Sequence, residues 1–238
     1  MQTKIFSEID LRNKKLQNAY STLIGNLHLI GKERKLKSIA ITSCSNEEGK
    51  TQLAADLAIN LAIMGKKILL IDLDFRKTSN SKNDKTRAFG AYGIYQYFTC
   101  SVEISDILCK TNFENLYYIN AGKPNGNPMS IICSEKLGTF INQEEKKYDL
   151  IIIDTSSIGD TPDSVIISAM ADAAVLIAKK GYTKISDIIK AQDQLLKADA
   201  NLIGVILNRY GKIRRKDTSA VDYYQKVQTV KNISVSNL

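Results

Sequence analysis

Gly49, Lys50 and Thr51 form the end of a possible phosphate-binding loop of the pattern G-x-x-x-x-G-K-[ST]. The segment "ITSCSNEEGKTQLAADLAINLA" (41–62) passes from an apolar stretch through a polar turn into a helical pattern, which is the setting such a loop requires. There the helix start offers N–H groups and a positive dipole to a phosphate, the lysine reaches the β- and γ-phosphates, and the threonine hydroxyl binds Mg²⁺. A strict match needs glycine where the chain has Cys44. The pattern therefore predicts a phosphate site with one departure.

Carboxylates end two further apolar runs. Asp72 and Asp74 close "KILLIDLD", and Asp154 closes "DLIIID". Residues i and i+2 of an extended strand point the same way, so Asp72 and Asp74 are expected to face one site, where such a pair can hold a metal ion and accept a proton from a hydroxyl. Singly, each acid is equally compatible with a helix N-cap or a solvated loop end. Because open α/β sheets bind ligands at the carboxyl ends of their strands, the three acids together with Lys50 and Thr51 favour a nucleotide site.

The elements that would position these residues alternate along the chain. Apolar runs predict buried strands at "SIAIT", "KILLIDLD", "NLYYINAG", "DLIIID", "AAVLIA" and "NLIGVILN". Helical patterns predict helices over 7–30, 50–64, 93–110, 128–147 and 183–198, with a charged break over 31–37 and loops over 75–90 and 122–128. Fully apolar strands that alternate with helices imply a doubly wound, mainly parallel α/β sheet.

The composition limits the class of protein. Of 238 residues, 44% are hydrophobic and 24% are charged, as in an ordinary soluble domain, and no apolar run approaches the length of about 18 residues that a membrane span needs. The four cysteines have no metal-ligand spacing, which predicts free thiols in the cytosol. The single histidine, His28, lies on the apolar side of its helix and is expected to pack there.

The net charge of +8 belongs to the two ends of the chain. Residues 1–37 carry eight Lys or Arg against three acids, and residues 209–238 carry seven against two. Basic ends suit an anionic membrane face, and equally they are solvated tails; without an aromatic-interleaved basic stripe, no nucleic acid partner is expected. We therefore divide the chain into an N-terminal helix and basic break (1–37), an α/β domain (38–210) and a polar, basic tail (211–238).

Several segments together resemble the bacterial tyrosine kinases (BY-kinases) of capsular and exopolysaccharide synthesis, which are P-loop proteins related to the partition and division-site ATPases. "SCSNEEGKTQLAADLAINLAIMGKKILLIDLDFRKT" is similar to the family's Walker A motif and to its Asp-x-Asp-x-Arg "Walker A-prime" motif. "NAGKPNGNPMSIICSEKL" resembles its Ala-Gly…Asn-Pro segment, and "YDLIIIDTS" resembles its Walker B motif. "ADAAVLIAKKGYTKISDIIKAQDQLLKADANLIGVILNRY" is similar to its C-terminal third, so the resemblance covers nearly the whole chain.

The resemblance implies a role for each matching residue. Lys50 would bind phosphate, and Asp72 would take the proton from the acceptor tyrosine, with Asp74 beside it. Thr51, Asp74 and Asp154 would hold Mg²⁺, with Asp154 acting through water. Tyr223 and Tyr224, near the C-terminus, would accept the phosphoryl group. The nucleotide would lie against Ser45, Asn46, Glu47, Glu48, Gly49, Lys50, Thr51 and Gln52.

The resemblance also implies a biological setting. The cofactors would be ATP and Mg²⁺. In the Gram-positive arrangement the kinase is a separate cytoplasmic chain, recruited to the inner face of the membrane by a chain-length-determining adaptor that activates it. Copies of the chain would associate and phosphorylate one another, and a cognate phosphatase would reverse the modification.

Two departures from the family pattern lie in the nucleotide motifs. Asn46-Glu47 stand where the family commonly has Pro-Gly, and Ser157 stands where its Walker B motif usually has proline. A glycine at position 47 would adopt positive φ without cost, and a carboxylate there would repel phosphate if it turned inward but not if it faced solvent. The retained Lys50 and Asp72 favour a working site of reduced affinity or turnover.

A third departure concerns assembly. Asn18, Ser21 and Ile24 occupy the places of a Glu-x-x-Arg-x-x-Arg segment that builds a ring of subunits in the family, so ring formation is in doubt. Two alternatives to an autokinase therefore stay open. One is a degenerate nucleotide-binding switch or scaffold without phosphotransfer. The other is a partition or division-site ATPase, which the absence of a second loop lysine at Ser45 disfavours.

Overall fold

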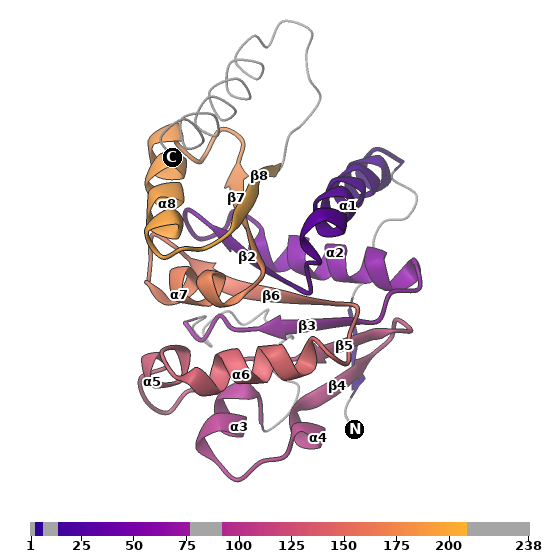
Figure 1. Cartoon of the computed structure of the whole chain (residues 1–238), viewed down its shortest axis with the longest axis vertical. Coiled ribbons are helices and arrows are strands. Elements are labelled where there is room, and N and C mark those ends of the chain that lie inside the picture. Colours follow the sequence, from indigo (N-terminus) through magenta and orange to yellow (C-terminus); the bar gives the residue numbers. More distant parts are fainter. Residues whose placement is uncertain (1–2, 7–13, 77–91, 209–238) are drawn as a thin grey trace, which may run out of the picture.

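The computed structural model describes residues 3–6, 14–76 and 92–208, which form an eight-stranded sheet flanked by helices (Figure 1). The predicted acceptors Tyr223 and Tyr224 lie outside the described residues. The strands are β1 (Thr3–Lys4), β2 (Ser38–Ser43), β3 (Ile68–Asp72), β4 (Leu108–Thr111), β5 (Leu116–Ile119), β6 (Leu150–Ser157), β7 (Ala173–Lys179) and β8 (Leu202–Asn208). The helices are α1 (Lys14–Arg34), α2 (Lys50–Ile63), α3 (Ile94–Thr99), α4 (Ile104–Ile107), α5 (Met129–Ile132), α6 (Glu135–Glu144), α7 (Asp163–Met170) and α8 (Ile185–Lys197).

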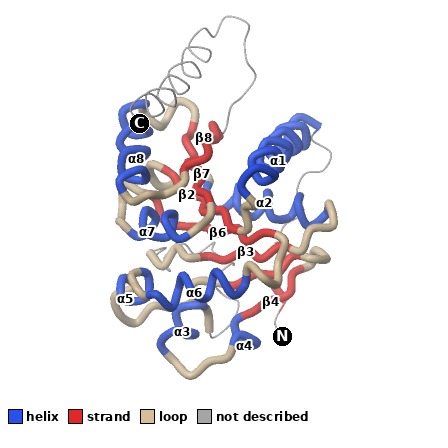
Figure 2. The backbone as a smooth tube through the Cα atoms, viewed as in Figure 1, coloured by secondary structure: helices blue, strands red, loops and turns tan. Residues whose placement is uncertain are grey.

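The sheet is mainly parallel, as the sequence predicts. Its strand order is β1-β4-β5-β3-β6-β2-β7-β8, and every described pair is parallel except β4 with β5. Figure 2 shows the strands as a central layer between helices. Because β2, β6 and β3 are neighbours and run in the same direction, their carboxyl ends meet at one edge of the sheet. These are the strands that carry the predicted site.

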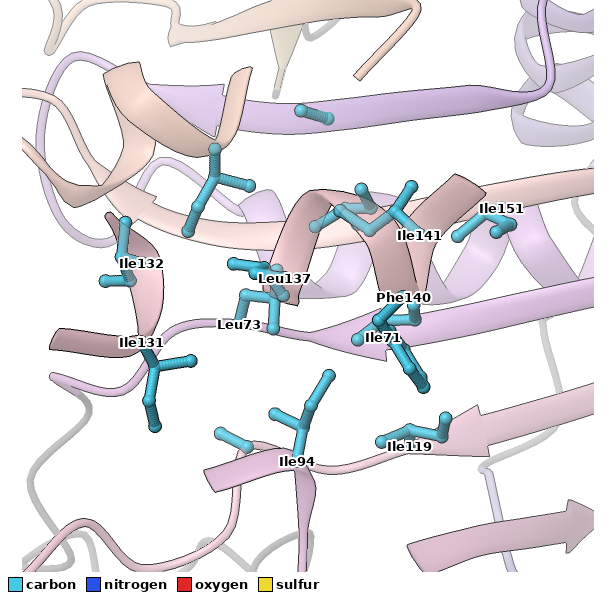
Figure 3. Packing of buried hydrophobic residues seen from close by; sticks show 14 of the residues in the cluster. Ile71, Leu73, Ile94, Ile119, Ile131, Ile132, Leu137, Phe140, Ile141 and Ile151 are labelled. Carbon is cyan, nitrogen blue, oxygen red and sulfur yellow. The ribbon is translucent and has the colours of Figure 1, made fainter. Parts of the chain in front are cut away.

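Both faces of the central strands are buried because the middle residues of these strands are apolar. Ile39 and Ile41 of β2 belong to the core under α1 and α2, whereas Ala40 between them belongs to the core on the opposite face. In that second core, Leu137 and Ile141 of α6 lie over β3, as Figure 3 shows. Alternation of apolar side chains on two covered faces confirms the doubly wound architecture.

Some predicted boundaries are wrong. The helix expected to end at residue 30 continues to Arg34, and residues 108–111 form β4 rather than the end of a helix. The predicted helix over 128–147 is two helices, α5 and α6, because Cys133 and Ser134 interrupt it. His28, expected to pack, is exposed. Short amphipathic runs are compatible with either element, and tertiary contacts decide between them.

Candidate functional site

The phosphate loop, residues 44–49, connects β2 to α2 as the sequence predicts. Gly49 has φ 94°, and the next residue, Lys50, begins α2. A Cβ on Gly49 would lie 2.2 Å from Nδ2 of Asn208, so glycine is required there both by the backbone and by the close approach of that side chain. The N–H of Leu53 donates to the Gly49 carbonyl over 3.0 Å, so α2 is continuous from its first turn. Its amino end therefore lies at the carboxyl edge of the sheet.

The loop is held in shape by the buried carboxylate of Glu48. One of its oxygens accepts the Ser45 N–H over 3.0 Å, and the other accepts the Thr183 hydroxyl. Asn208 Nδ2 donates to the Glu48 carbonyl over 2.8 Å. Sequence reasoning missed Thr183 and Asn208, because nothing in their spacing links them to a loop more than 130 residues away. The loop is thus braced by the elements around β7 and β8 without any ligand.

Two of the three residues that depart from the family motifs, Asn46 and Ser157, contact each other. Ser157, at the end of β6, donates to Asn46 Oδ1 over 3.3 Å and to the Asp160 carboxylate. Glu47 adopts φ 60°, and the residue is exposed. Lys179 Nζ lies 3.4 Å from the Glu47 carbonyl oxygen. The positive φ that the family's glycine would adopt is therefore retained here by a glutamate.

Cys44 does not add charge to the site. It is 5% exposed, and burial together with the nearby Glu48 and Asp187 carboxylates raises the pKa of its thiol to about 12. The thiol therefore stays protonated at neutral pH. A neutral side chain where the strict pattern has glycine does not oppose phosphate binding electrostatically.

The acids of β3 and β6 lie side by side at the same edge. Asp72 and Asp154 are direct partners in the parallel pairing of the two strands, and the Leu73 N–H donates to the Asp154 carbonyl over 2.8 Å. Asp72, Asp74 and Asp154 are all buried. Burial of several carboxylates at one point costs free energy unless something compensates it, which is typical of a binding site.

The strand argument that joined Asp72 to Asp74 is wrong. β3 ends at Asp72, and Leu73 and Asp74 lie beyond it. Instead the two residues are connected by a hydrogen bond, because the Asp74 N–H donates to Asp72 Oδ1 over 2.9 Å. The pair is still close, but a turn rather than a pleated strand positions the second carboxylate.

The first residues of α2 divide between the interior and the surface. Lys50 is 6% exposed, whereas Thr51 and Gln52 are exposed. Gln52 Nε2 donates to Asp56 over 2.8 Å, and Tyr20 of α1 donates to the same carboxylate over 2.8 Å. The N-terminal helix is thereby attached to the helix that begins at the phosphate loop.

The donor set fits a nucleotide with Mg²⁺. Within residues 3–6, 14–76 and 92–208, no group of three His, Cys, Asp or Glu side chains is arranged to hold a metal ion by itself. Mg²⁺ is ordinarily held by one or two carboxylates together with phosphate oxygens and water, which suits the Thr51 hydroxyl and the buried carboxylates of Asp74 and Asp154. A helix amino end, a buried lysine and hard oxygen donors are the groups that a nucleotide with its magnesium requires.

Comparison with known proteins identifies the class. The family model of the CobQ/CobB/MinD/ParA nucleotide binding domain matches residues 39–236. The septum site-determining protein MinD from Pyrococcus horikoshii, complexed with Mg-ADP, superimposes with a TM-score of 0.60 at 27% identity over 78% of this chain and 76% of that one. The chain therefore has a nucleotide-binding fold of this family.

Curated relatives narrow the class further. The tyrosine-protein kinase CpsD of Streptococcus pneumoniae is 34% identical over 82% of this chain and 85% of its own length. The tyrosine-protein kinase YwqD of Bacillus subtilis is 30% identical over 79% of each chain. The chimerical protein CapA2B2 shares the fold, with a TM-score of 0.77 at 21% identity over 89% of this chain and 95% of that one. The chain belongs to the bacterial tyrosine kinase family.

In the part of the chain that the structure describes, no helix is both long enough and apolar enough to cross a bilayer.

Proposed function

We propose that the chain is an ATP-dependent protein tyrosine kinase that phosphorylates its own C-terminal tyrosines and regulates capsular or exopolysaccharide synthesis. Family membership supports this proposal. The observation that carries it is the register of β3 and β6, which sets the buried Asp72 beside Asp154 at the edge where Lys50 begins α2. A phosphate-binding helix start and a buried carboxylate pair at one edge of a sheet suit phosphoryl transfer.

Each side chain would have a distinct role in the reaction. The Lys50 ammonium and the amino end of α2 would bind the phosphates of ATP and neutralise their charge. Asp72 would accept the proton of the tyrosine hydroxyl while the tyrosine oxygen forms a bond to the γ-phosphorus of ATP. The bond between that phosphorus and the oxygen of the leaving ADP would break in the same step. Thr51, Asp74 and Asp154 would hold Mg²⁺, which supplies further charge neutralisation when bound. Positioning and charge neutralisation account for most catalysis of this kind.

The loop residues from Ser45 to Gln52 would surround the nucleotide. The bracing of Ser45 by Glu48 supports this, because a hydrogen bond within the loop itself fixes its backbone. A binding site that is already ordered loses less conformational entropy when it binds.

We further infer that a membrane adaptor of the chain-length-determining type activates the kinase and recruits it to the inner face of the membrane. Membership of the tyrosine kinase family and likeness in fold to the chimerical protein CapA2B2 support this inference. Self-association would allow one copy to phosphorylate another. Ile24 is 8% exposed within the core under α1, so that position of the family's ring-forming segment cannot supply a charge to a neighbouring copy.

A second candidate function is a nucleotide-binding switch without phosphotransfer. The observation that favours it is the backbone of Glu47, which holds φ 60° without the glycine that this conformation prefers. Strain in the phosphate loop would lower the rate of phosphoryl transfer more than it lowers the stability of the fold. The switch would bind ATP and leave every tyrosine unmodified.

Phosphotyrosine mapping by mass spectrometry separates these candidates. The full chain is incubated with ATP and Mg²⁺, with and without a peptide from an adaptor's cytoplasmic tail. Replacement of Tyr223 and Tyr224 together by Phe should remove most of the phosphotyrosine, and Asp72→Asn should abolish it. Tyr182→Phe, at an exposed tyrosine, is the matched control and should leave the signal unchanged. ATP binding without phosphotyrosine under every condition would favour the switch.

A further inference from the structure

Arg76, in the segment after β3, and Asp163, the first residue of α7, form a paired contact. Arg76 Nε donates to Asp163 Oδ2 over 2.8 Å, and Nη2 donates to Oδ1 over 3.2 Å. The Asp163 side chain is 1% exposed, whereas that of Arg76 is 39% exposed. A two-point contact between a guanidinium and a carboxylate fixes direction as well as distance. The pair is therefore more than a surface ion pair.

Hydrogen bonds connect this pair to the predicted base. The Arg76 N–H donates to Asp74 Oδ1 over 3.2 Å, and the Asp74 N–H donates to Asp72 Oδ1 over 2.9 Å. Each carboxylate is thus capped by the backbone two residues further on, an arrangement typical of Asx turns. The guanidinium of Arg76 in turn contacts Asp163. These hydrogen bonds therefore connect the Asp72 carboxylate to Asp163 through Asp74 and Arg76.

The partner residue lies on a rigid support. Asp163 is the first residue of α7, and the segment that leads to it from β6 is fixed to the phosphate loop. The Ile158 N–H donates to the Ser43 carbonyl over 2.9 Å, and the Gly159 N–H donates to the Cys44 carbonyl over 3.0 Å. A Cβ on Gly159 would lie 2.7 Å from that same carbonyl oxygen, so the contact is tight. Asp163 is therefore fixed relative to the phosphate loop.

We propose that Asp163 is a positioning residue for phosphoryl transfer: through Arg76 it holds Asp72 and Asp74 at a fixed place relative to the phosphate loop. This inference rests on the proposed kinase function. In the segment after β3, the Arg76 N–H contacts Asp74 and the Arg76 guanidinium contacts Asp163, so this residue links the carboxylates to the support. The hydrogen bond that Arg76 donates to Asp163 also raises the pKa of Arg76, so the guanidinium stays charged throughout the working range of pH.

A positioning role and a purely structural role predict different kinetics. If Asp163 only stabilised the start of α7, its loss would lower the melting temperature and leave kcat of the folded enzyme unchanged. If it positions the base, its loss lowers kcat while nucleotide affinity stays the same, because the phosphate loop is braced separately by Glu48. Displacement of a reacting group by about 1 Å can cost on the order of 100-fold in rate.

The test compares kcat for autophosphorylation with the dissociation constant for ADP measured without Mg²⁺, so that a displaced Asp74 does not enter the binding measurement. We expect Asp163→Asn and Arg76→Gln each to lower kcat by at least about 10-fold, with the ADP constant within about twofold of wild type. Arg76→Lys, which keeps the charge but not the two-point contact, should recover part of the rate. Arg76 is the more exposed partner, so its variants remain informative even if Asp163→Asn fails to fold.

The ion pair between Glu144, the last residue of α6, and Lys147 provides a matched control. Lys147 Nζ lies 2.6 Å from Glu144 Oε1, again with an exposed base and a buried acid. Lys147→Gln therefore removes a comparable ion pair remote from the nucleotide loops and should leave kcat unchanged. Unchanged kcat in folded Arg76→Gln and Asp163→Asn would overturn the positioning role. Absence of phosphotyrosine in the wild-type protein would instead contradict the kinase function on which it rests.

Discussion

Glu47→Gly should stabilise the protein and change nucleotide affinity only slightly. Glu47 has φ 60°, a left-handed conformation that costs an L-residue about 1–2 kcal/mol and costs glycine almost nothing. The greater freedom of glycine in the unfolded chain offsets about 0.5–1 kcal/mol of this gain. The net gain is therefore at most about 1.5 kcal/mol, which corresponds to an increase in melting temperature of up to about 6 °C for a chain of this size.

The effect on nucleotide binding follows from the exposure of the side chain. An exposed carboxylate near a phosphate interacts through water and salt, so the repulsion is at most about 1 kcal/mol. Titration of Mg·ADP by calorimetry should show less than about a fivefold gain in affinity for both Glu47→Gly and Glu47→Gln. The glutamine variant removes the charge but keeps the strained backbone, so only the glycine variant should raise the melting temperature.

Asp199→Gly is the matched control, because Asp199 has φ 57° at a position remote from the loop. It should give a similar gain in stability and no change in Mg·ADP affinity. A tenfold or larger gain in affinity in Glu47→Gln would show that the carboxylate lies against the phosphates. A lower melting temperature in Glu47→Gly would refute the reasoning from backbone conformation.

Two further results are expected elsewhere in the fold. Ser157→Ala should lower the free energy of unfolding by about 1 kcal/mol, because Asn46 loses a hydrogen-bond donor. Thermal unfolding at neutral pH measures this loss. An unchanged melting temperature would show that the contact contributes nothing. Burial raises the pKa of Asp56 despite its hydrogen bond from Tyr20. The protonated carboxyl therefore favours the folded state, and this contribution to stability is lost as the pH rises through the raised pKa. Asp56→Asn should therefore melt higher than wild type at pH 7 and similarly at acidic pH, and a lower melting temperature at pH 7 would contradict this.

The central strands could be predicted from the sequence because each contains a continuous apolar run. β2, β3, β6 and β7 lie where the apolar runs place them, and their polar last residues come together at one edge. β1 and β4 could not be predicted. β1 has two residues and β4 has four, so neither shows a periodicity, and each depends on pairing along the edge of the sheet beyond β5.

The candidate site, too, could be predicted only in part from the sequence. The motifs indicate Lys50 and Asp72 because each lies at an end of a recognisable element. Asp154 is indicated by the apolar run before it, although β6 continues to Ser157 rather than ending at Asp154 as predicted. Nothing local indicates Asn208 or Asp163, whose roles come from contacts across more than 80 residues of chain. The exposure of Glu47 also could not be deduced, because its sequence position leaves open whether the carboxylate faces the loop or solvent.

The most direct test of the account is phosphotyrosine formation by the purified chain in ATP and Mg²⁺, with Lys50→Met as the comparison. Lys50 is buried at the first position of α2, where the account places the phosphates. The account predicts phosphotyrosine at Tyr223 and Tyr224 in the wild-type protein, more of it when an adaptor peptide is present, and none in Lys50→Met. Equal phosphotyrosine in the two proteins would contradict the assignment of this loop as the ATP site.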